Sequence, residues 1–195
     1  MASSVKKPKP GRLRIVAGKW RSRLLDIADV QGLRPTSERI RETLFNWLAP
    51  TLDGARCLDL FAGTGVLGLE ALSRGAAEVV FVEKSSIAVK VLRENIEALD
   101  AQDAMVHNTD AMQFLTGSTL GTFDVVFLDP PFAADMLDDL CRLLGAASVL
   151  ASGARIYLEE DRAGPALTLP NGWHMVKSKS AGNVRYSLAQ CGKDP

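Results

Sequence analysis

Cysteine and histidine are scarce in this chain of 195 residues, which contains three cysteines and two histidines. Cys57, Cys141 and Cys191 are far apart and never form the Cys-x-x-Cys spacing of zinc or redox sites. His107 and His174 have no potential metal ligands at suitable spacing. The sequence therefore predicts no disulfide framework and no metal site, and its thiols are expected to be reduced and mostly structural.

Long apolar runs are also missing. No stretch approaches the roughly 20 apolar residues of a membrane span. Residues 1–12 are basic and rich in proline and serine, whereas a secretion signal has an apolar segment. These absences predict a cytoplasmic protein without a membrane segment, and we expect residues 1–12 to form a disordered basic arm.

Net charge is absent overall, because 23 basic residues balance 23 acidic residues. The charges are nevertheless unevenly distributed, since residues 1–41 contain eleven lysines or arginines and three acidic residues. Phosphate contacts dominate nucleic-acid affinity, so the basic end is expected to face a polyanion. A merely solubilising arm is the alternative for residues 1–12. In residues 14–23, aliphatic residues and Trp20 interleave with the charges, which indicates a folded surface.

The hydrophobic pattern becomes regular after residue 50. Apolar runs typical of strands alternate with segments typical of helices. Strands are predicted at 56–60, 79–82, 104–107, 124–128 and 155–158, and helices at 65–74, 85–99, 110–115 and 134–144. This alternation predicts a doubly wound α/β sheet with parallel strands. Residues 173–179 and 184–190 flank Ser-Ala-Gly-Asn, which predicts an antiparallel hairpin at the end of the sheet.

The segment before this sheet has a different pattern. Residues 12–26 predict two short strands around a turn at Gly18. Thr36 or Ser37 is predicted to cap a helix that ends at Pro50. We therefore divide the chain into a basic arm (1–12), an N-terminal extension of hairpin and helix (13–50) and an α/β domain (51–191).

A glycine-rich loop joins the first predicted strand of this domain to its helix. Gly63, Gly65 and Gly68 match the Gly-x-Gly-x-x-Gly fingerprint, in which glycines let the backbone approach a nucleotide cofactor. Glu83 ends the next strand, where an acidic residue can bind ribose hydroxyls. These features alone leave nicotinamide and S-adenosylmethionine cofactors both open. Asp110 follows the third strand and is expected to accept from the adenine amino group, to cap the next helix, or both.

A second motif, Asp129-Pro130-Pro131-Phe132, directly follows the apolar strand at 124–128. Ligands of open α/β sheets bind at this carboxyl edge. An exocyclic amine on a base ring is a poor nucleophile, because its lone pair is delocalised. The Asp129 carboxylate and a backbone carbonyl such as that of Pro130 would bind the two amine hydrogens and direct the lone pair toward a methyl donor. Phe132 is expected to stack on the exposed base, although a plain turn with a solvent-facing aspartate is the alternative.

Both motifs resemble those of known methyltransferases. Residues 59–65 (DLFAGTG) resemble motif I of class I methyltransferases, and DPPF is a form of the [DN]PP[FYW] motif of enzymes that act on adenine N6, cytosine N4 or guanine N2. Residues 14–21 (RIVAGKWR) and 34–48 (RPTSERIRETLFNWL) resemble the N-terminal signature of the bacterial small-subunit ribosomal RNA guanine-N2 methyltransferases of the RsmD type. The resemblance extends from Arg14 to about Gln190.

The resemblance implies a Rossmann-like class I methyltransferase that transfers a methyl group from S-adenosyl-L-methionine to N2 of a specific guanine in 16S ribosomal RNA. It further implies an assembling small-subunit particle as the partner, and we expect the enzyme to be a monomer. The implied catalytic residues are Asp129, Pro130 and Phe132. The implied cofactor site comprises Thr36, Arg39, Asp59, Phe61, Gly63, Gly65, Glu83, Asp110 and Ala111. The implied RNA contacts are Arg14, Lys19, Arg21 and Arg23.

Other functions are weighed against this one. An adenine-N6 methyltransferase acting on DNA or RNA fits DPPF equally well, but such enzymes usually carry a recognition insertion for which 195 residues leave little room. A nicotinamide-dependent oxidoreductase would need a hydride-relay residue, and neither Tyr157 nor Tyr186 starts a Tyr-x-x-x-Lys pair. A non-catalytic ribosome-assembly factor would not need the intact carboxylates of Asp59, Glu83 and Asp129. For Arg39 and Arg41, the alternative to a role in the site is that both are merely exposed charges on the surface of a helix.

Overall fold

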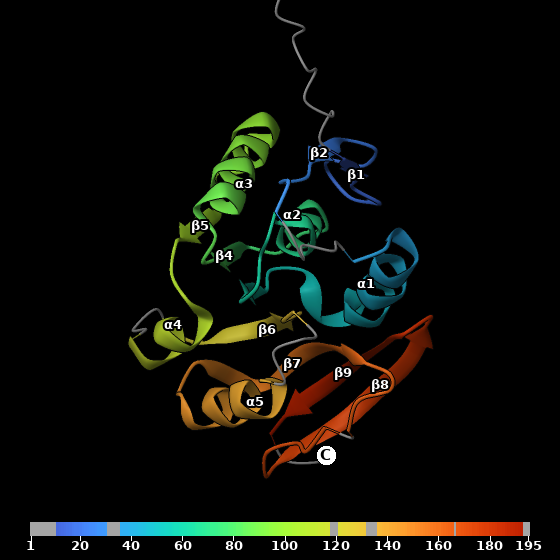
Figure 1. The fold of residues 1–195 in the computed structure, drawn as a ribbon, viewed down its shortest axis with the longest axis vertical. Helices are drawn as coiled ribbons and strands as arrows, with labels where there is room; N and C mark the ends of the chain where they lie inside the picture. The colour runs from blue at the N-terminus through green and yellow to red at the C-terminus, as the bar shows by residue number, and fades with distance from the viewer. Residues whose placement is uncertain (1–10, 31–35, 118–120, 132–135, 166, 193–195) are drawn as a thin grey trace, which may run out of the picture.

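The computed structural model describes residues 11–30, 36–117, 121–131, 136–165 and 167–192. Most of the predicted basic arm and the predicted base-stacking residue Phe132 lie outside these ranges. The centre of the structure is a seven-stranded sheet in the order β5-β4-β3-β6-β7-β9-β8 (Figure 1). Its strands are β3 (Arg56–Asp59), β4 (Glu78–Val82), β5 (Ala104–His107), β6 (Phe123–Leu128), β7 (Leu150–Asp161), β8 (Trp173–Ala181) and β9 (Val184–Cys191).

The strand directions confirm the predicted doubly wound sheet. Strands β3 to β7 pair in parallel, whereas β9 is antiparallel to both of its neighbours, β7 and β8. The central strands are short apolar runs buried on both faces, as parallel strands covered by helices must be. All three cysteines are buried and free, which agrees with their expected structural role.

Helices cover the two faces of the sheet in two groups. One apolar core contains residues of α1 (Glu38–Leu52), α2 (Val66–Ser73) and α3 (Ser86–Leu99). The other contains residues of α4 (Ala111–Gly117) and α5 (Leu137–Ala146), and Figure 1 shows these helices apart from the first group. No helix in the described part of the chain is long and apolar enough to cross a membrane.

Helix α1 begins as predicted but ends later than predicted. The Ser37 hydroxyl caps it by accepting from the backbone N–H of Ile40 at 3.4 Å. Pro50 was expected to end the helix, yet the helix continues to Leu52. Proline removes one helical donor, but burial of Leu52 and a hydrogen bond from the Thr51 hydroxyl to the Leu48 carbonyl hold the last turn in place.

The N-terminal extension forms the predicted hairpin and packs on α2. Strands β1 (Arg12–Arg14) and β2 (Leu24–Asp26) pair antiparallel, and Gly18 lies in the connecting loop at φ +83°. A Cβ at Gly18 would lie 1.7 Å from the Ser73 carbonyl oxygen, so only glycine permits this contact with the end of α2. The Ser73 hydroxyl also accepts from the backbone N–H of Trp20 and donates to the Ala17 carbonyl.

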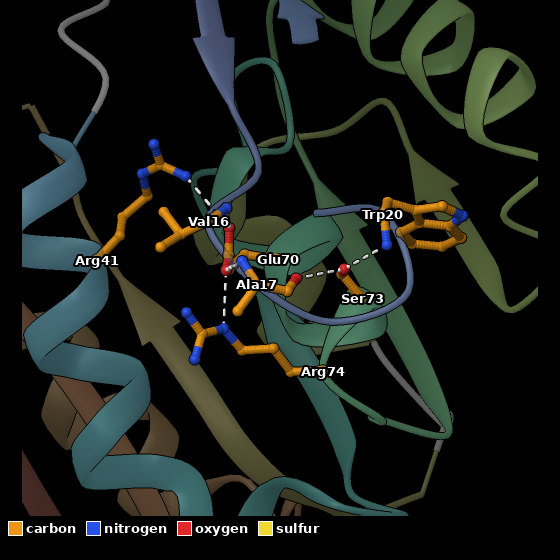
Figure 2. Close-up of polar contacts among 7 residues, drawn as sticks. All are labelled: Val16, Ala17, Trp20, Arg41, Glu70, Ser73 and Arg74. Carbon is orange, nitrogen blue, oxygen red and sulfur yellow. Dashed lines mark hydrogen bonds and ion pairs between the residues drawn. The ribbon is translucent and has the colours of Figure 1, made fainter. Parts of the chain in front are cut away.

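Glu70 of α2 joins this loop to α1 (Figure 2). Its fully buried carboxylate accepts from the backbone N–H groups of Val16 and Ala17 at 2.8 and 3.0 Å. It also forms ion pairs with Arg41 at 3.3 Å and Arg74 at 2.7 Å. Arg41 is therefore a buried structural residue, contrary to its reading as an exposed helix charge, and desolvation lowers its pKa. One carboxylate thus holds the hairpin loop, α1 and α2 together.

We expect Glu70→Gln to lower the free energy of unfolding by about 3–5 kcal/mol, because it leaves the Arg41 guanidinium buried without its counter-charge. Urea denaturation followed by circular dichroism would measure this loss. Arg12→Ala is the matched control, since it removes an ion pair with Asp26 whose side chains are 61% and 49% exposed. The control should change stability by less than about 1 kcal/mol. Similar losses in the two variants would contradict an anchoring role for Glu70.

Candidate active site

A cavity of about 570 Å³ lies at the carboxyl ends of the central parallel strands. Its volume is within the usual range for small-molecule sites. The order of the sheet reverses between β3 and β6, and ligands of doubly wound sheets bind at such a switch point. Residues from several predicted motifs line the cavity, namely Thr36, Asp59, Phe61, Gly63, Glu83, Asp110, Ala111, Asp129 and Pro130.

The glycine loop between β3 and α2 has the conformation that its sequence predicts. Gly63 and Gly65 have φ values of +53° and +83°, which favour glycine. A Cβ at Gly65 would lie 2.2 Å from a methyl group of Leu92. Gly68 allows close packing of α2 on the sheet, since a Cβ there would lie 2.2 Å from the ring of Phe81.

Two carboxylates bind backbone N–H groups in and around this loop. Asp59 accepts from the N–H of Gly68 at 3.1 Å. Glu83 accepts from the N–H groups of Gly63 at 2.9 Å and Ser85 at 2.7 Å. In dinucleotide-binding proteins the loop and the N-terminus of the following helix instead face a pyrophosphate. These acidic partners disfavour an anionic group next to the loop, while the remaining lone pairs of Glu83 stay able to accept from hydroxyl groups.

Asp59 is buried at the end of β3, and its environment disfavours its charge. Desolvation by burial raises its pKa to about 7, although the bond from the Gly68 N–H acts in the opposite direction. The Glu83 carboxyl raises the pKa further. A positively charged ligand group in the cavity would offset this cost of ionisation.

Asp129 follows β6 and lies part-buried in the same cavity, so it is not the solvent-facing turn residue of the alternative reading. The hydroxyl of Thr36, just before α1, donates to its Oδ2 at 3.2 Å. Thr36 thus contacts the predicted catalytic carboxyl, while Ser37 caps the helix. Burial raises the pKa of Asp129 well above its usual range, Glu159 raises it further, and the Thr36 bond lowers it.

The other predicted cofactor residues differ in how close they lie to the cavity. Asp110 caps α4, because its Oδ1 accepts from the N–H of Met112 at 2.9 Å, and it also lines the cavity. Its position therefore allows both predicted roles, as the helix cap and as a contact to adenine. Gly65 lies in the glycine loop next to the lining residues. Arg39 is exposed on α1 and is absent from the cavity wall among the described residues, so its cofactor contact stays a prediction.

The four predicted RNA-contacting residues are all exposed on the hairpin unit. Arg14 and Arg21 line a second, polar hollow of about 420 Å³ between the hairpin and α1. The Lys19 ammonium lies 5.1 Å from the centre of the Trp20 ring. Arg23 differs from the others, because its guanidinium donates to the Ala98 carbonyl at the end of α3 at 2.8 Å.

The sequence interpretation missed Glu159. This residue lies on β7 next to β6, is 4% exposed and lines the cavity together with Asp129. A signal was present, since Glu159 directly follows the apolar run Ile156-Tyr157-Leu158, just as Asp129 follows its own strand. Ala181 and Val184, at the turn of the β8–β9 hairpin, also reach the cavity.

Comparison with known proteins places the chain in a family. The model of a family described as conserved hypothetical protein 95 matches residues 13–190. Ribosomal RNA small subunit methyltransferase D of Escherichia coli K12 is 45% identical over 181 residues, which cover 92% of this chain and 90% of the relative. The chain belongs to the family of ribosomal RNA small subunit methyltransferase D.

Further members of this family and their structures agree. The methyltransferase D of Haemophilus influenzae is 42% identical over 183 residues and covers 92% of this chain and 94% of the relative. A solved Escherichia coli structure, provisionally described as a methyltransferase, has a TM-score of 0.87 at 41% identity and covers 94% of this chain and all of its own. The resemblance drawn from the motifs and the predicted enzyme class, a methyltransferase, are confirmed. These names do not specify the methylated atom.

The raised pKa of Asp59 has a consequence for stability. Its folded-state pKa is about 7 against an ordinary value of 3.8. Its contribution to the free energy of unfolding is therefore complete below about pH 4 and is lost as the pH rises toward 7. Asp59→Asn keeps an acceptor for Gly68 without a buried charge. We expect it to match the wild type near pH 4 and to be more stable at pH 8, by up to about 4 kcal/mol.

Denaturant titrations of the ligand-free protein at several pH values would measure this difference. Asp103→Asn is a matched control, because Asp103 is exposed in the turn before β5. It should leave the pH dependence unchanged. A wild type and an Asp59→Asn variant with equal pH dependence would contradict the cost of ionising Asp59.

Proposed function

We propose that this protein transfers a methyl group from S-adenosyl-L-methionine to the exocyclic N2 amino group of a specific guanine in 16S ribosomal RNA. The proposal deepens the family assignment by naming the cofactor, the base and the atom. The observation that carries it is the presence of Asp129, with its proline neighbour, in the same cavity as Asp59, Glu83 and the glycine loop.

The charge of the cavity supports the choice of cofactor. Five acidic residues line it, namely Asp59, Glu83, Asp110, Asp129 and Glu159, against one described basic residue, Lys84. Such a wall suits a cofactor with a sulfonium and an ammonium group, and it opposes the pyrophosphate of a nicotinamide dinucleotide. Two backbone donors of this region, the N–H groups of Gly63 and Gly68, are already bonded to Glu83 and Asp59. The ribose hydroxyls would bind to Glu83 and the adenine near Asp110 and Ala111.

When bound, S-adenosylmethionine supplies an electrophilic methyl group. Asp129 and the Pro130 carbonyl would accept the two hydrogens of the amine and so aim its lone pair at that methyl. The carboxylate also stabilises the positive charge that develops on nitrogen. The surplus amine proton passes to Asp129, whose raised pKa makes it a better base than an ordinary aspartate.

The exposed basic residues of the hairpin support an RNA substrate. Arg14, Lys19 and Arg21 are available for phosphate contacts, whereas Arg23 also holds α3. A small basic hairpin offers little surface for selection among free RNA sites, so we infer that the substrate is an assembling small-subunit particle. We further expect a monomer that acts in the cytoplasm, where such particles assemble.

The remaining alternatives make different predictions. A non-catalytic assembly factor would bind the particle without any need for Asp129. An adenine-N6 enzyme would require the same amine-binding residues but a different neighbouring group on the base. Identification of the methylated nucleoside therefore separates all three.

Mass spectrometry of ribosomal RNA nucleosides from cells lacking the protein should show the loss of one N2-methylguanine. We expect wild-type protein to restore it and Asp129→Ala to fail, with turnover lowered about 100- to 1,000-fold as for the loss of a positioned polar group. Asp129→Asn separates the two roles given to Asp129, because an amide oxygen still accepts an amine hydrogen, as the asparagine of the [DN]PP[FYW] pattern would, but cannot take up the surplus proton. Loss of N6-methyladenine would support the adenine alternative, and full restoration by Asp129→Ala would exclude Asp129 from the reaction.

Lys19→Glu combined with Arg21→Glu should weaken binding to the small-subunit particle and reduce its dependence on salt. Each lost phosphate contact lowers the slope of log affinity against log salt by roughly 0.7–0.9. Arg142→Glu with Lys177→Glu makes the same charge change on α5 and β8, far from the hairpin in Figure 1. Filter-binding titrations at several salt concentrations would compare the pairs. An equal slope in both variants would show that the hairpin residues make no phosphate contacts.

A further inference from the structure

Two carboxyl groups lie side by side at the edge of the sheet, and only one of them has a role in the proposed reaction. Strands β6 and β7 are parallel neighbours with Leu128 paired to Leu158. The residue after each of these leucines is acidic, and both acidic residues, Asp129 and Glu159, line the cavity. Asp129 lies one residue beyond β6, and the charge of Glu159 raises its pKa, so the two carboxyls are close enough to interact. The two carboxyls therefore reach the cavity together.

Glu159 is held rigidly in this position. It remains within β7, where it pairs with Tyr186 of β9, and its side chain is 4% exposed. The hydroxyl of the buried Tyr157 donates to its Oε1. A carboxylate has lone pairs on both oxygens, so it can accept from Tyr157 and from a ligand at once. The Glu159 charge also raises the pKa of Asp129, so it disfavours ionisation of the neighbouring carboxyl.

The chemistry of the bases suggests what this second acceptor recognises. In guanine the amine-bearing carbon has two ring neighbours, N1, which carries a hydrogen, and N3, which carries a lone pair. In adenine and cytosine the corresponding ring nitrogen, N1 or N3, carries a lone pair. A carboxylate on the N1 side of the amine would accept a hydrogen bond from guanine, whereas in the other two bases it would be repelled by the lone pair of the corresponding ring nitrogen.

We propose that Glu159 determines the choice of base by accepting a hydrogen bond from N1–H of guanine while Asp129 holds the neighbouring N2 amine. Glu159 is thus a specificity-determining residue for the reaction proposed above, on which this inference rests. The Tyr157 hydroxyl acts as a positioning group, because it orients the Glu159 carboxylate. DPPF provides acceptors for any exocyclic amine, and Glu159 restricts the site to guanine.

Base analogues at the methylated position test this role directly. Small subunits would be reconstituted with guanine, 2-aminopurine or hypoxanthine at the position mapped by mass spectrometry. 2-Aminopurine keeps the amine but has a lone pair at N1, whereas hypoxanthine keeps N1–H but lacks the amine. We expect the wild type to prefer guanine over 2-aminopurine by about 100-fold in kcat/KM, as for a buried polar group left unpaired. Hypoxanthine should accept no methyl group.

Glu159→Gln should strongly weaken this preference. With its amide oxygen bonded to the Tyr157 hydroxyl, the variant presents an N–H group, which repels N1–H of guanine and pairs with N1 of 2-aminopurine. We expect the preference for guanine to fall at least about 30-fold relative to the wild type. 2-Aminopurine also lacks the O6 atom of guanine, and this loss affects both proteins equally. Comparing the guanine to 2-aminopurine ratio of kcat/KM between wild type and variant therefore cancels it.

The outcomes separate this inference from the function on which it rests. If the wild type methylates guanine and 2-aminopurine equally, Glu159 does not read N1, and this conclusion stands even if Glu159→Gln does not fold. If Glu159→Gln loses activity on both bases by the same factor, its role is structural and the inference is overturned. If the wild type forms no N2-methylguanine at all, the proposed function itself fails.

Discussion

The parallel pairing of β3 with β6 is the constraint on which the site depends. Cys57 to Asp59 pair with Val125 to Phe127, so both strands end at the same edge of the sheet. The sheet order reverses here, because β4 and β5 continue on one side and β7 on the other. No crossover helix covers the edge at such a point. The glycine loop after β3 and the Asp-Pro-Pro turn after β6 therefore open into one cavity, although Asp129 lies 61 positions after Gly68 in the sequence.

This edge concentrates negative charge at a cost in free energy. Asp59, Asp129 and Glu159 all lie in the cavity, and burial raises the pKa of both aspartates. The protein offsets part of this cost with backbone and hydroxyl donors, such as the Gly68 N–H and the Thr36 hydroxyl. A cationic cofactor and the amine hydrogens of a base would offset more. The site is therefore electrostatically complementary to the ligands of the proposed reaction.

The N-terminal extension is held to this edge by buried polar contacts. Glu70 and Ser73 of α2 bind the loop between β1 and β2, and Asn95 of α3 bonds to both Asp26 and the Thr64 carbonyl in the glycine loop. Arg41 links α1 to the same Glu70. The segment that carries the basic surface thus shares its anchors with the helices around the cavity. This places Thr36 beside Asp129 and the hairpin at a defined position relative to the sheet.

The sequence by itself determined the order of strands and helices after residue 50, the glycine loop and the amine-binding turn, because each depends on local periodicity or a short motif. It also determined the family, since residues 14–21 and 34–48 carry a distinctive signature. Only the tertiary structure decided that Arg41 is buried against Glu70, that α1 continues past Pro50, and that Glu159 lines the same cavity as Asp129. These features depend on contacts between residues far apart in the chain, where burial and charge pairing override what an isolated residue prefers.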